Sequence, residues 1–238
     1  MNIGVIFAGG VGTRMKTTGK PKQFLMVHGK PIIVHTIEIF QNHPEIDGII
    51  CVCVADWIDY MEELKYRYRL DKIGKIVPGG ETGQLSIYNG LKAAAECYGL
   101  QDNIVLIHDG VRPLISAETI SANIDSVKQY GSAITSVPAQ ETVIVVDDNE
   151  QVQEIVDRSH ARLARAPQSF YLKEILEAQE TAIAQGLTNM TDSCTLMKHF
   201  NKKLVTIPGV KNNIKITTPE DFYTFRALYD AKENEQLE

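Results

Sequence analysis

The fold of this chain is decided by residues 3–15, which read IGVIFAGGVGTRM. The segment opens with an apolar run at 3–8 that predicts a buried strand. The glycines that follow carry no Cβ, so a ligand can approach the backbone closely. Glycine-rich turns at the ends of parallel strands commonly bind phosphate groups in α/β proteins. The stretch therefore predicts an α/β fold with a phosphate-binding loop after its first strand.

The sequence around this loop is strongly basic. The first 37 residues contain no Asp or Glu, yet they hold Arg14, Lys16, Lys20, Lys22 and Lys30 in a chain whose formal net charge is -6. Clustered cations without neighbouring acids attract anions. We therefore expect phosphate groups to bind here, with Lys16, Lys20 and Lys30 forming a solvated basic rim.

Two familiar phosphate-binding motifs are excluded by the lettering of this region. A dinucleotide fingerprint needs a third glycine where this chain has Met15. A Walker loop needs Gly-Lys followed by Ser or Thr, whereas Gly19-Lys20 is followed by Pro21. The remaining pattern, AGGVGTRM with PKQFL and GKPII, is similar to the signature of nucleotidyltransferases. Such enzymes join a nucleoside triphosphate to a sugar or polyol phosphate and release pyrophosphate.

Length and composition are typical of a soluble enzyme. The chain has 238 residues, of which 44% are hydrophobic and 23% charged, and we expect one α/β domain over residues 1–238. No apolar run is long enough for a membrane span, and the N-terminus lacks a secretory pattern. We expect a cytoplasmic protein without membrane or nucleic-acid partners. Its four cysteines are expected to be thiols, and its histidines show no zinc-site spacing.

Strand-like and helix-like segments alternate along most of the chain. Apolar runs predict strands at 3–8, 48–54, 76–78, 103–109 and 213–216, and helical spacing predicts helices at 31–41, 57–70, 85–98 and 172–185, from Asp192 and from Thr218. This alternation predicts a Rossmann-like, mostly parallel sheet flanked by helices. Ligands bind beyond the carboxyl ends of such strands, where this chain places the polar segments 9–22, 79–86 and 108–113.

Residues 133–156 interrupt this alternation. The segment 133–137 is strand-like, and the β-rich stretches 142–146 and 152–156 flank an Asp-Asp-Asn-Glu turn, which predicts a hairpin. An isolated two-stranded ribbon is only marginally stable in water. We therefore expect a β-arm at about 133–160 that packs against another subunit. The acidic tail at about 232–238 is expected to fray.

Ten short segments occur in an order that is typical of one enzyme family. They are AGGVGTRM, PKQFL, GKPIIVHT, Gly-Gly followed by SIYNGL, HDGVRP, Pro138 with Thr142, VDR, APQSF, Thr191-Asp192 and NIKITTPED. Together they resemble the cytidylyltransferases that act on methylerythritol phosphate or ribitol 5-phosphate. The resemblance implies CTP as the nucleotide, Mg²⁺ as a cofactor and a homodimer with an exchanged β-arm.

The chemistry of this family depends on positive charge. A substrate phosphate oxygen attacks the α-phosphorus of CTP in line while negative charge spreads onto the leaving pyrophosphate. Because no proton has to be removed near neutral pH, positioning and charge stabilisation dominate. The resemblance implies Arg14, Lys22 and Lys215 as the catalytic cations. Lys215 alternates with Ile214 and Ile216, which argues against an incidental surface lysine.

The resemblance also implies the nucleotide-binding groups: Ala8, Gly9, Gly10, Gly12, Thr13, Gly79, Gly80, Glu81, Ser86 and Asp109. Asp109 ends a predicted buried strand, where an acid is costly unless it is paired or holds a metal. The resemblance makes it the Mg²⁺ ligand, and pairing with Arg112 is compatible with that role. We expect His108 to be structural. Gly83 stands where relatives usually carry Arg, so one loop contact is lost or supplied elsewhere.

The polyol phosphate also needs binding groups. Thr142 and Arg158 match the family's pair on the arm, which binds the substrate in the neighbouring subunit's site. Arg162 and Arg165 are rivals for the phosphate because an arginine fork suits phosphate oxygens. Asp192 either caps a helix or orients a polyol hydroxyl.

Some sequence features resemble one substrate branch of the family and some resemble the other. An AGG loop, a spacing from Arg14 to Lys22 one position longer than is usual for methylerythritol phosphate enzymes, and Trp57 resemble the ribitol 5-phosphate branch. The VDR segment and Thr191-Asp192 resemble the methylerythritol branch. We favour D-ribitol 5-phosphate, which gives CDP-ribitol for capsule or teichoic acid synthesis. The alternative is 2-C-methyl-D-erythritol 4-phosphate, used in isoprenoid biosynthesis.

Two further functions stay open at this point. One is a non-catalytic CTP-binding regulator, although the presence of Arg14, Lys22, Asp109 and Lys215 together argues against it because a sensor has no need of groups that stabilise a transition state. The other is a sugar-nucleotide pyrophosphorylase that uses UTP or GTP.

Overall fold

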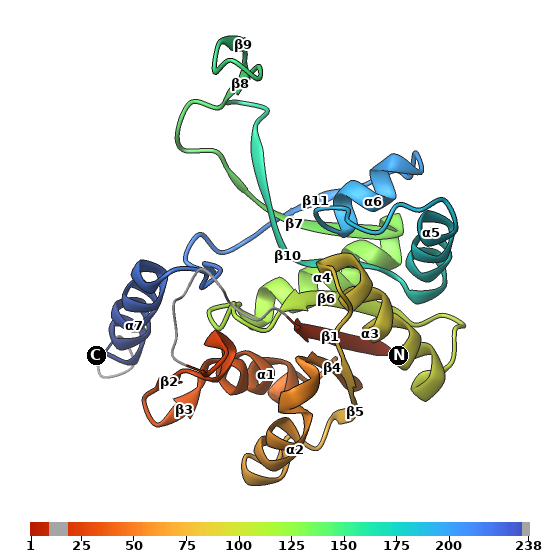
Figure 1. Ribbon diagram of the computed structural model, residues 1–238, viewed down its shortest axis with the longest axis vertical. Coiled ribbons are helices and arrows are strands. Elements are labelled where there is room, and N and C mark those ends of the chain that lie inside the picture. The colour runs from red at the N-terminus through yellow and green to blue at the C-terminus, as the bar shows by residue number, and fades with distance from the viewer. Residues whose placement is uncertain (10–18, 235–238) are drawn as a thin grey trace.

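The computed structural model describes residues 1–9 and 19–234 of the chain. Seven strands form one sheet in the order β11-β7-β10-β6-β1-β4-β5 (Figure 1). They are β1 (Asn2–Ala8), β4 (Gly48–Cys53), β5 (Ile73–Pro78), β6 (Ile104–Asp109), β7 (Ser132–Pro138), β10 (Arg162–Tyr171) and β11 (Thr206–Pro208). Only β10 in this sheet runs antiparallel to its neighbours, β6 and β7. The predicted, mostly parallel α/β sheet is confirmed.

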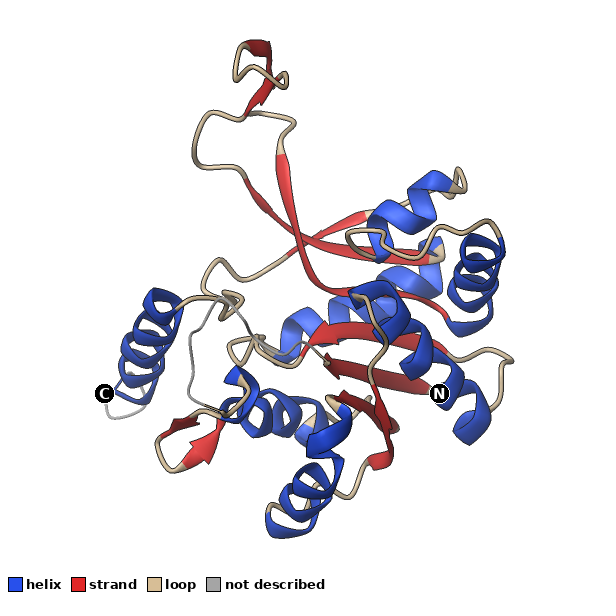
Figure 2. Ribbon diagram, in the orientation of Figure 1, coloured by secondary structure: helices blue, strands red, loops and turns tan. Residues whose placement is uncertain are grey.

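Helices cover both faces of the sheet (Figure 2). One face packs against α1 (Ile32–Asn42), α2 (Ile58–Arg67) and α4 (Ala117–Tyr130), and the other packs against α3 (Gly83–Tyr98), α5 (Leu172–Ala184) and α6 (Ser193–His199). Since both faces are covered, all six residues of β4 are buried. That burial raises the pKa of the Cys53 thiol to about 11, and all four cysteines are free thiols, as expected.

Side-chain caps set where several helices begin. The Thr82 and Ser116 hydroxyls accept hydrogen bonds from the backbone amides of Leu85 and Thr119, at the starts of α3 and α4. The last helix, α7 (Pro219–Asn234), begins directly after Thr218, as its Thr-Pro start predicts. No helix in the described residues is both long and apolar enough to cross a bilayer.

The segment that carries Lys215 differs from the prediction. We expected a strand at 213–216, and this is wrong, because the segment has no regular structure. The edge strand next to β7 is β11 instead. The Ile216 amide donates to the Val111 carbonyl at 3.0 Å, and the Ile216 side chain packs with Val111, Leu114 and Phe225. Its apolar alternation therefore reflects packing against the loop after β6. The strand β10 and the helix α4 were not predicted.

A small apolar cluster brings together three segments that are distant in sequence. It consists of Val27, Ile32, Val111, Leu114, Ile216 and Phe225. Through it, α7 packs against the chain after Asp109 and against the short hairpin of β2 (Met26–Val27) and β3 (Lys30–Pro31). The segments that hold Lys22, Asp109 and Lys215 consequently share one packed support.

The predicted hairpin is present and projects from the body of the molecule (Figure 1). It pairs β8 (Ile144–Val146) with β9 (Val152–Ile155) in an antiparallel ribbon. Its turn is closed by Asp147, whose Oδ1 accepts hydrogen bonds from the amides of Asn149 and Gln151 at 2.9 and 3.0 Å. Every residue of β8 and β9 is exposed. We refer to residues 139–161, which join β7 to β10, as the arm.

Candidate active site

The polar segments predicted from the sequence meet at one edge of the sheet. Phe7 at the end of β1 is in register with Asp109 at the end of β6, and Ala8 is in register with Cys53 at the end of β4. Because these strands are parallel, their carboxyl ends lie together. The loops that follow β1, β5 and β6 therefore begin at the same edge, as predicted.

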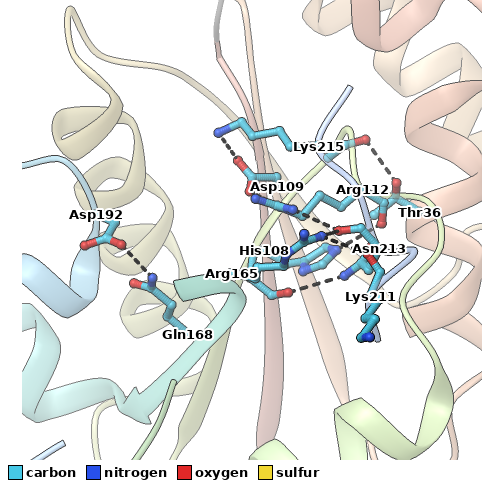
Figure 3. A network of polar contacts seen from close by, with 12 residues as sticks. Thr36, His108, Asp109, Arg112, Arg165, Gln168, Asp192, Lys211, Asn213 and Lys215 are labelled. Atoms are coloured by element: carbon cyan, nitrogen blue, oxygen red, sulfur yellow. Dashed lines mark hydrogen bonds and ion pairs between the residues drawn. The ribbon is translucent and has the colours of Figure 1, made fainter. Parts of the chain in front are cut away.

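Asp109 is the centre of the charged groups at this edge (Figure 3). Its carboxylate is buried and ion-paired on both oxygens, with Lys215 Nζ 2.6 Å from Oδ1 and Arg112 Nε 2.7 Å from Oδ2. Burial opposes ionisation, but the two neighbouring cations outweigh it and lower the pKa of Asp109 to about 2. Asp109 is therefore ionised at neutral pH. Asp109 holds both cations in place. The expected pairing with Arg112 is present, and Lys215 is a second partner.

Two arginines hold the backbone next to Lys215. The Asn213 carbonyl accepts hydrogen bonds from Arg112 Nη1 and Arg165 Nη1, both at 2.9 Å. Arg165 Nη1 also donates to the Lys211 carbonyl at 3.2 Å. Burial and the nearby Arg112 lower the pKa of Arg165. Arg158, Arg162 and Arg165 were the candidates for binding the substrate phosphate. Arg165 is linked to Asp109 within its own chain, because it shares the Asn213 carbonyl with Arg112.

His108, which we expected to be structural, is fully buried next to Asp109 in the sequence. Its Nε2 lies 3.2 Å from the Arg112 carbonyl, and because a carbonyl can only accept, Nε2 carries the proton. Burial lowers the pKa of His108 to about 4, so the ring is neutral. His108 Nδ1 and Asn213 Oδ1 are both buried without a hydrogen-bond partner among the described residues. Both unsatisfied acceptors adjoin the charged cluster.

Glycines allow the ends of β1 and β5 to approach each other closely. A Cβ added to Gly9 would lie 3.0 Å from Ser86 Oγ and 3.4 Å from the Gly79 Cα. The Gly80 amide donates to Ser86 Oγ at 3.0 Å, and Ser86 Oγ donates to the Thr82 carbonyl at 2.9 Å. Ser86 therefore holds the turn in which Gly79 and Gly80 lie. Ala8 and Gly9 border it, whereas Glu81 is exposed.

Part of the predicted phosphate loop lies outside the described residues. Gly10, Gly12, Thr13 and Arg14 all fall in that gap. Lys22 follows it and begins a single 3-10 turn, Lys22–Phe24.

Gln23 ties Lys22 to the end of β1. Its Nε2 donates to the Ala8 carbonyl at 2.7 Å, and the side chain is buried. On the other side of this turn, the buried Phe24 ring stacks on Trp57 at 5.0 Å between ring centroids. Sequence reasoning missed Gln23. No local signal in PKQFL indicates this contact, which places the backbone of Lys22 at the same edge as Asp109.

The predicted substrate residues on the arm stand apart from this cluster. Thr142 and Arg158 are both exposed, and Arg158 Nη1 makes only a long hydrogen bond, 3.5 Å, to the Gln140 carbonyl. No contact recorded for the described residues joins either of them to Asp109 or Lys215. A cavity of about 320 Å³ opens at the base of the arm, lined by Val137, Pro138, Ala139, Gln140, Glu141, Val143, Leu163, Arg165 and Lys211.

Asp192 caps α6, as one of its two predicted roles required. Its Oδ1 accepts from the Thr195 amide at 2.8 Å and from the Thr195 hydroxyl at 2.7 Å. Its Oδ2 accepts from Gln168 Nε2 at 2.8 Å. Gln168 was not predicted, because nothing in the local sequence links a strand residue to a cap far along the chain.

Among the described residues, no group of three or more acids, histidines or cysteines is arranged to hold a metal ion. Asp109 is the carboxylate that the ion pairs described above place at this edge. Mg²⁺ commonly uses one or two carboxylates together with waters and substrate phosphates, and does not need a cage of protein ligands. The carboxylate oxygens of Asp109 each retain acceptor capacity beyond their ion pairs.

Comparison with known proteins leads to one family of cytidylyltransferases by sequence and by structure. The profile of the family IspD: 2-C-methyl-D-erythritol 4-phosphate cytidylyltransferase matches residues 3–230. A ribitol-5-phosphate cytidylyltransferase of Streptococcus agalactiae serotype V is 60% identical over 237 residues, covering 100% of this chain and 98% of the relative. One of Vibrio parahaemolyticus serotype O3:K6 is 48% identical, covering 100% of this chain and 99% of that relative.

A more distant relative and a solved structure are named for methylerythritol compounds. A 2-C-methyl-D-erythritol 4-phosphate cytidylyltransferase of Clostridium acetobutylicum is 37% identical, covering 96% of this chain and 97% of the relative. The crystal structure of 4-diphosphocytidyl-2C-methyl-D-erythritol synthase from Anaerococcus prevotii superimposes with a TM-score of 0.83 at 30% identity, over 96% of each chain.

Proposed function

The chain belongs to the 2-C-methyl-D-erythritol 4-phosphate cytidylyltransferase family, and we propose that it transfers CMP from CTP to D-ribitol 5-phosphate. The products are CDP-ribitol and pyrophosphate. The observation that carries the choice of substrate is the full-length match, at 60% identity, to enzymes named for ribitol 5-phosphate. The relatives named for 2-C-methyl-D-erythritol 4-phosphate are more distant, at 37% and 36% identity. We expect the enzyme to act in the cytoplasm and to serve cell-surface polymer synthesis.

The charged edge suits the proposed reaction. A phosphate oxygen of ribitol 5-phosphate bonds to the α-phosphorus of CTP, and the bond from that phosphorus to the bridging oxygen breaks as pyrophosphate leaves. The Lys215 side chain is 41% exposed although it is paired with the buried Asp109, so it can also contact a substrate phosphate. Asp109 holds Lys215 in place before the substrate binds, which provides the preorganised charge that phosphoryl transfer requires.

The remaining catalytic assignments rest on the family resemblance. Lys22 is held at the end of β1 by Gln23 and lies at the edge where the α-phosphate is expected. Arg14, outside the described residues, is proposed as its companion in stabilising the charge of the transition state. The turn of Gly79 and Gly80, closed by Ser86, is proposed to contact the cytidine part of CTP.

The residues at this edge fit a magnesium ion that binds together with CTP. Asp109 would be its protein ligand, and the phosphates and water would complete the coordination sphere. When bound, the ion would neutralise charge on the phosphates. Arg112 and Lys215 hold the Asp109 carboxylate ionised and in a fixed orientation, which is what a ligand to a hard cation requires.

We further propose that the protein is a homodimer in which the arm of one subunit completes the site of the other. The support is the set of exposed apolar side chains on and beside the arm: Ile144, Val145, Val146, Val152, Ile155 and Leu163. Ile144 pairs with Ile155 and Val146 with Val152 across the ribbon, and exposed apolar side chains gathered in this way are typical of interaction sites on soluble proteins. Thr142 and Arg158 lie on the same arm, so a partner's site is where they would bind the polyol phosphate.

Pyrophosphate release from the purified protein tests the proposed function. The protein is assayed with Mg²⁺, CTP and either D-ribitol 5-phosphate or 2-C-methyl-D-erythritol 4-phosphate, and then with UTP or GTP in place of CTP. We expect ribitol 5-phosphate to give the higher kcat/KM and CTP to be required. A preference for the methylerythritol substrate, equal use of UTP, or CTP binding without turnover would each overturn the proposal.

A further inference from the structure

Gln168 lies on the same face of the sheet as Asp109. It is in register with Ile107 on the neighbouring strand β6, and paired residues in an antiparallel ladder project from the same face. Asp109 follows Ile107 by two residues, so its side chain also projects from that face. The buried side chains of Ile107 and Phe170, which pack against α3, α5 and α6, agree with this assignment. Gln168 is thus a diagonal neighbour of Asp109, with backbones roughly 7 Å apart.

The hydrogen bonds of Gln168 fix the orientation of its amide. Its Oε1 accepts from the Cys194 backbone amide at 2.8 Å, so its Nε2 must face the other way. That nitrogen donates to Asp192 Oδ2 at 2.8 Å. The side chain of Gln168 is only 6% exposed, and both of its ends are satisfied. Such a buried amide has one stable orientation, because turning it over would place donor against donor at Cys194.

Asp192 is thereby held in a single position. The Thr195 amide and hydroxyl bind one carboxylate oxygen, and Gln168 binds the other. A helix cap needs only one of these oxygens, so the bond from Gln168 lies beyond what capping requires. A carboxylate has about four acceptor positions, so acceptor capacity remains. Asp192 is only half-buried, unlike Gln168.

The segment before Asp192 is fastened to the nucleotide side of the site. Gln84, in the first turn of α3, donates from Nε2 to the Leu187 carbonyl at 2.8 Å and accepts from the Met190 amide at 2.7 Å. The Thr82 hydroxyl donates to the Thr188 carbonyl at 2.5 Å. Asp192 is therefore positioned from two directions, by α3 and by β10.

We infer that Gln168 is a positioning residue that holds Asp192 as the hydrogen-bond acceptor for hydroxyl groups of the polyol chain. The inference rests on the proposed function. Figure 3 shows the Gln168-Asp192 pair and the Asp109-Lys215 pair at the same end of the sheet. A polyol whose phosphate lies near Lys215 extends its hydroxyls away from the reacting atoms, and an oriented carboxylate is a strong acceptor for them.

Two single variants and one double variant test this inference by steady-state kinetics. Gln168→Met has a similar length but lacks both hydrogen bonds, and Asp192→Asn keeps the capping oxygen while removing the charge. The double variant combines Gln168→Glu with Asp192→Asn. The amide at position 192 then donates to the carboxylate at position 168, and that carboxylate still accepts from the Cys194 backbone amide. The double variant therefore rebuilds the structural contact with donor and acceptor exchanged.

Each single variant should raise the KM for ribitol 5-phosphate about tenfold, the effect of losing one hydrogen bond to a charged group, and leave the KM for CTP within about twofold. The double variant should recover the melting temperature of the wild type but keep the raised KM, because the acceptor presented to the polyol has changed. Ser116→Ala, which removes the cap of α4 on the opposite face, serves as the control. It should lower the melting temperature and leave both KM values unchanged.

The outcomes separate this inference from the proposed function. Single variants that leave the KM for ribitol 5-phosphate unchanged, or a double variant that restores it, would show that the pair is only structural. If the wild type uses 2-C-methyl-D-erythritol 4-phosphate instead, the substrate assignment fails, and the same KM comparison with that polyol decides the role of Gln168. A wild type that turns over neither polyol overturns both.

Discussion

The cluster around Asp109 and the arm are opposite kinds of structure in one chain. Around Asp109, charged groups are buried, paired and held from several elements, with Lys215, Arg112 and Arg165 linked through one carboxylate and the Asn213 carbonyl. On the arm, the apolar side chains face solvent, and the Ile155 side chain is 68% exposed. The cluster is complete within one subunit, whereas the arm buries its apolar surface only if a partner is present.

Under the proposed function, the two regions have separate tasks. Preorganised cations stabilise charge that develops during a reaction and need no rearrangement to do so. An exposed ribbon contributes nothing until it is bound, because an isolated hairpin is marginal in water. We therefore propose that the cluster performs the chemical step and that assembly of the dimer completes the substrate site. The predictions below test that division.

The largest effect is expected from Lys22→Ala. If Lys22 stabilises charge that grows in the transition state, its loss should lower kcat by about 10²–10³ while changing the KM for CTP little. Steady-state kinetics with varied CTP measures both. Lys75→Ala removes a lysine that is paired with Glu96 on the surface of β5, and serves as the control. A raised KM with near-normal kcat would assign Lys22 to ground-state binding instead.

The second effect concerns the sharing of sites between subunits. Arg158→Ala and Lys22→Ala homodimers should both be nearly inactive if the arm acts in the partner's site. A heterodimer of the two, isolated with different affinity tags after co-expression, would hold one site with both lesions and one with neither. Its activity should recover toward half that of the wild type. Heterodimers that stay inactive, or a wild type that is active as a monomer in sedimentation experiments, would place Arg158 in its own subunit or remove its role.

A smaller effect is expected when the arm is made polar. Ile155→Asp should raise the dissociation constant of the dimer by at least about tenfold, because a buried charge at the centre of an apolar interface is unfavourable. The melting temperature of the separated monomer should not change, since the Ile155 side chain is 68% exposed in its own subunit. Analytical ultracentrifugation over a dilution series measures the constant.

The matched control is Tyr66→Asp, because Tyr66 lies on α2 and is 90% exposed. It introduces the same charge at an exposed apolar residue away from the arm, and the dimer should be unaffected. Equal dissociation constants for the Ile155→Asp variant and the wild type would mean that the arm is not the interface.

The sequence singled out Asp109 and Lys215, which the structure joins in an ion pair, because their signals are local. Asp109 ends an apolar run, and Lys215 alternates with two isoleucines. The catalytic roles of these residues and of Lys22 stay predictions. The alternation around Lys215 was also misleading, because Ile216 is apolar in order to pack against Val111 and Phe225 and not to form a strand. Gln23, Gln168 and the link from Arg165 to Asn213 were beyond reach, since each joins segments whose proximity follows only from the completed sheet.

The arm illustrates the same limit in another form. Its hairpin was predictable because Asp147 to Glu150 is a local turn sequence between two β-rich stretches. What it contacts depends on a second molecule, and the exposed Thr142 and Arg158 have no recorded contact with the described charged cluster of their own chain. Periodicity therefore locates such an element without identifying its partner.

The smallest effect concerns the stability of the cluster at low pH. The pKa of Asp109 is lowered to about 2 from its usual 3.8, so its ion pairs stabilise the fold fully above about pH 4 and this contribution is lost as the pH falls toward 2. The shift corresponds to about 2 kcal/mol of unfolding free energy.

In Asp109→Asn the protein should be less stable at neutral pH, and its unfolding free energy should depend less on pH in this window. Urea unfolding of both proteins at a series of pH values between 2.5 and 6 measures the two slopes. Other acids titrate equally in both proteins, so the difference in slope isolates Asp109. Parallel slopes would mean that the carboxylate is not held by Lys215 and Arg112 in solution, and the preorganisation that separates the cluster from the arm would have no support.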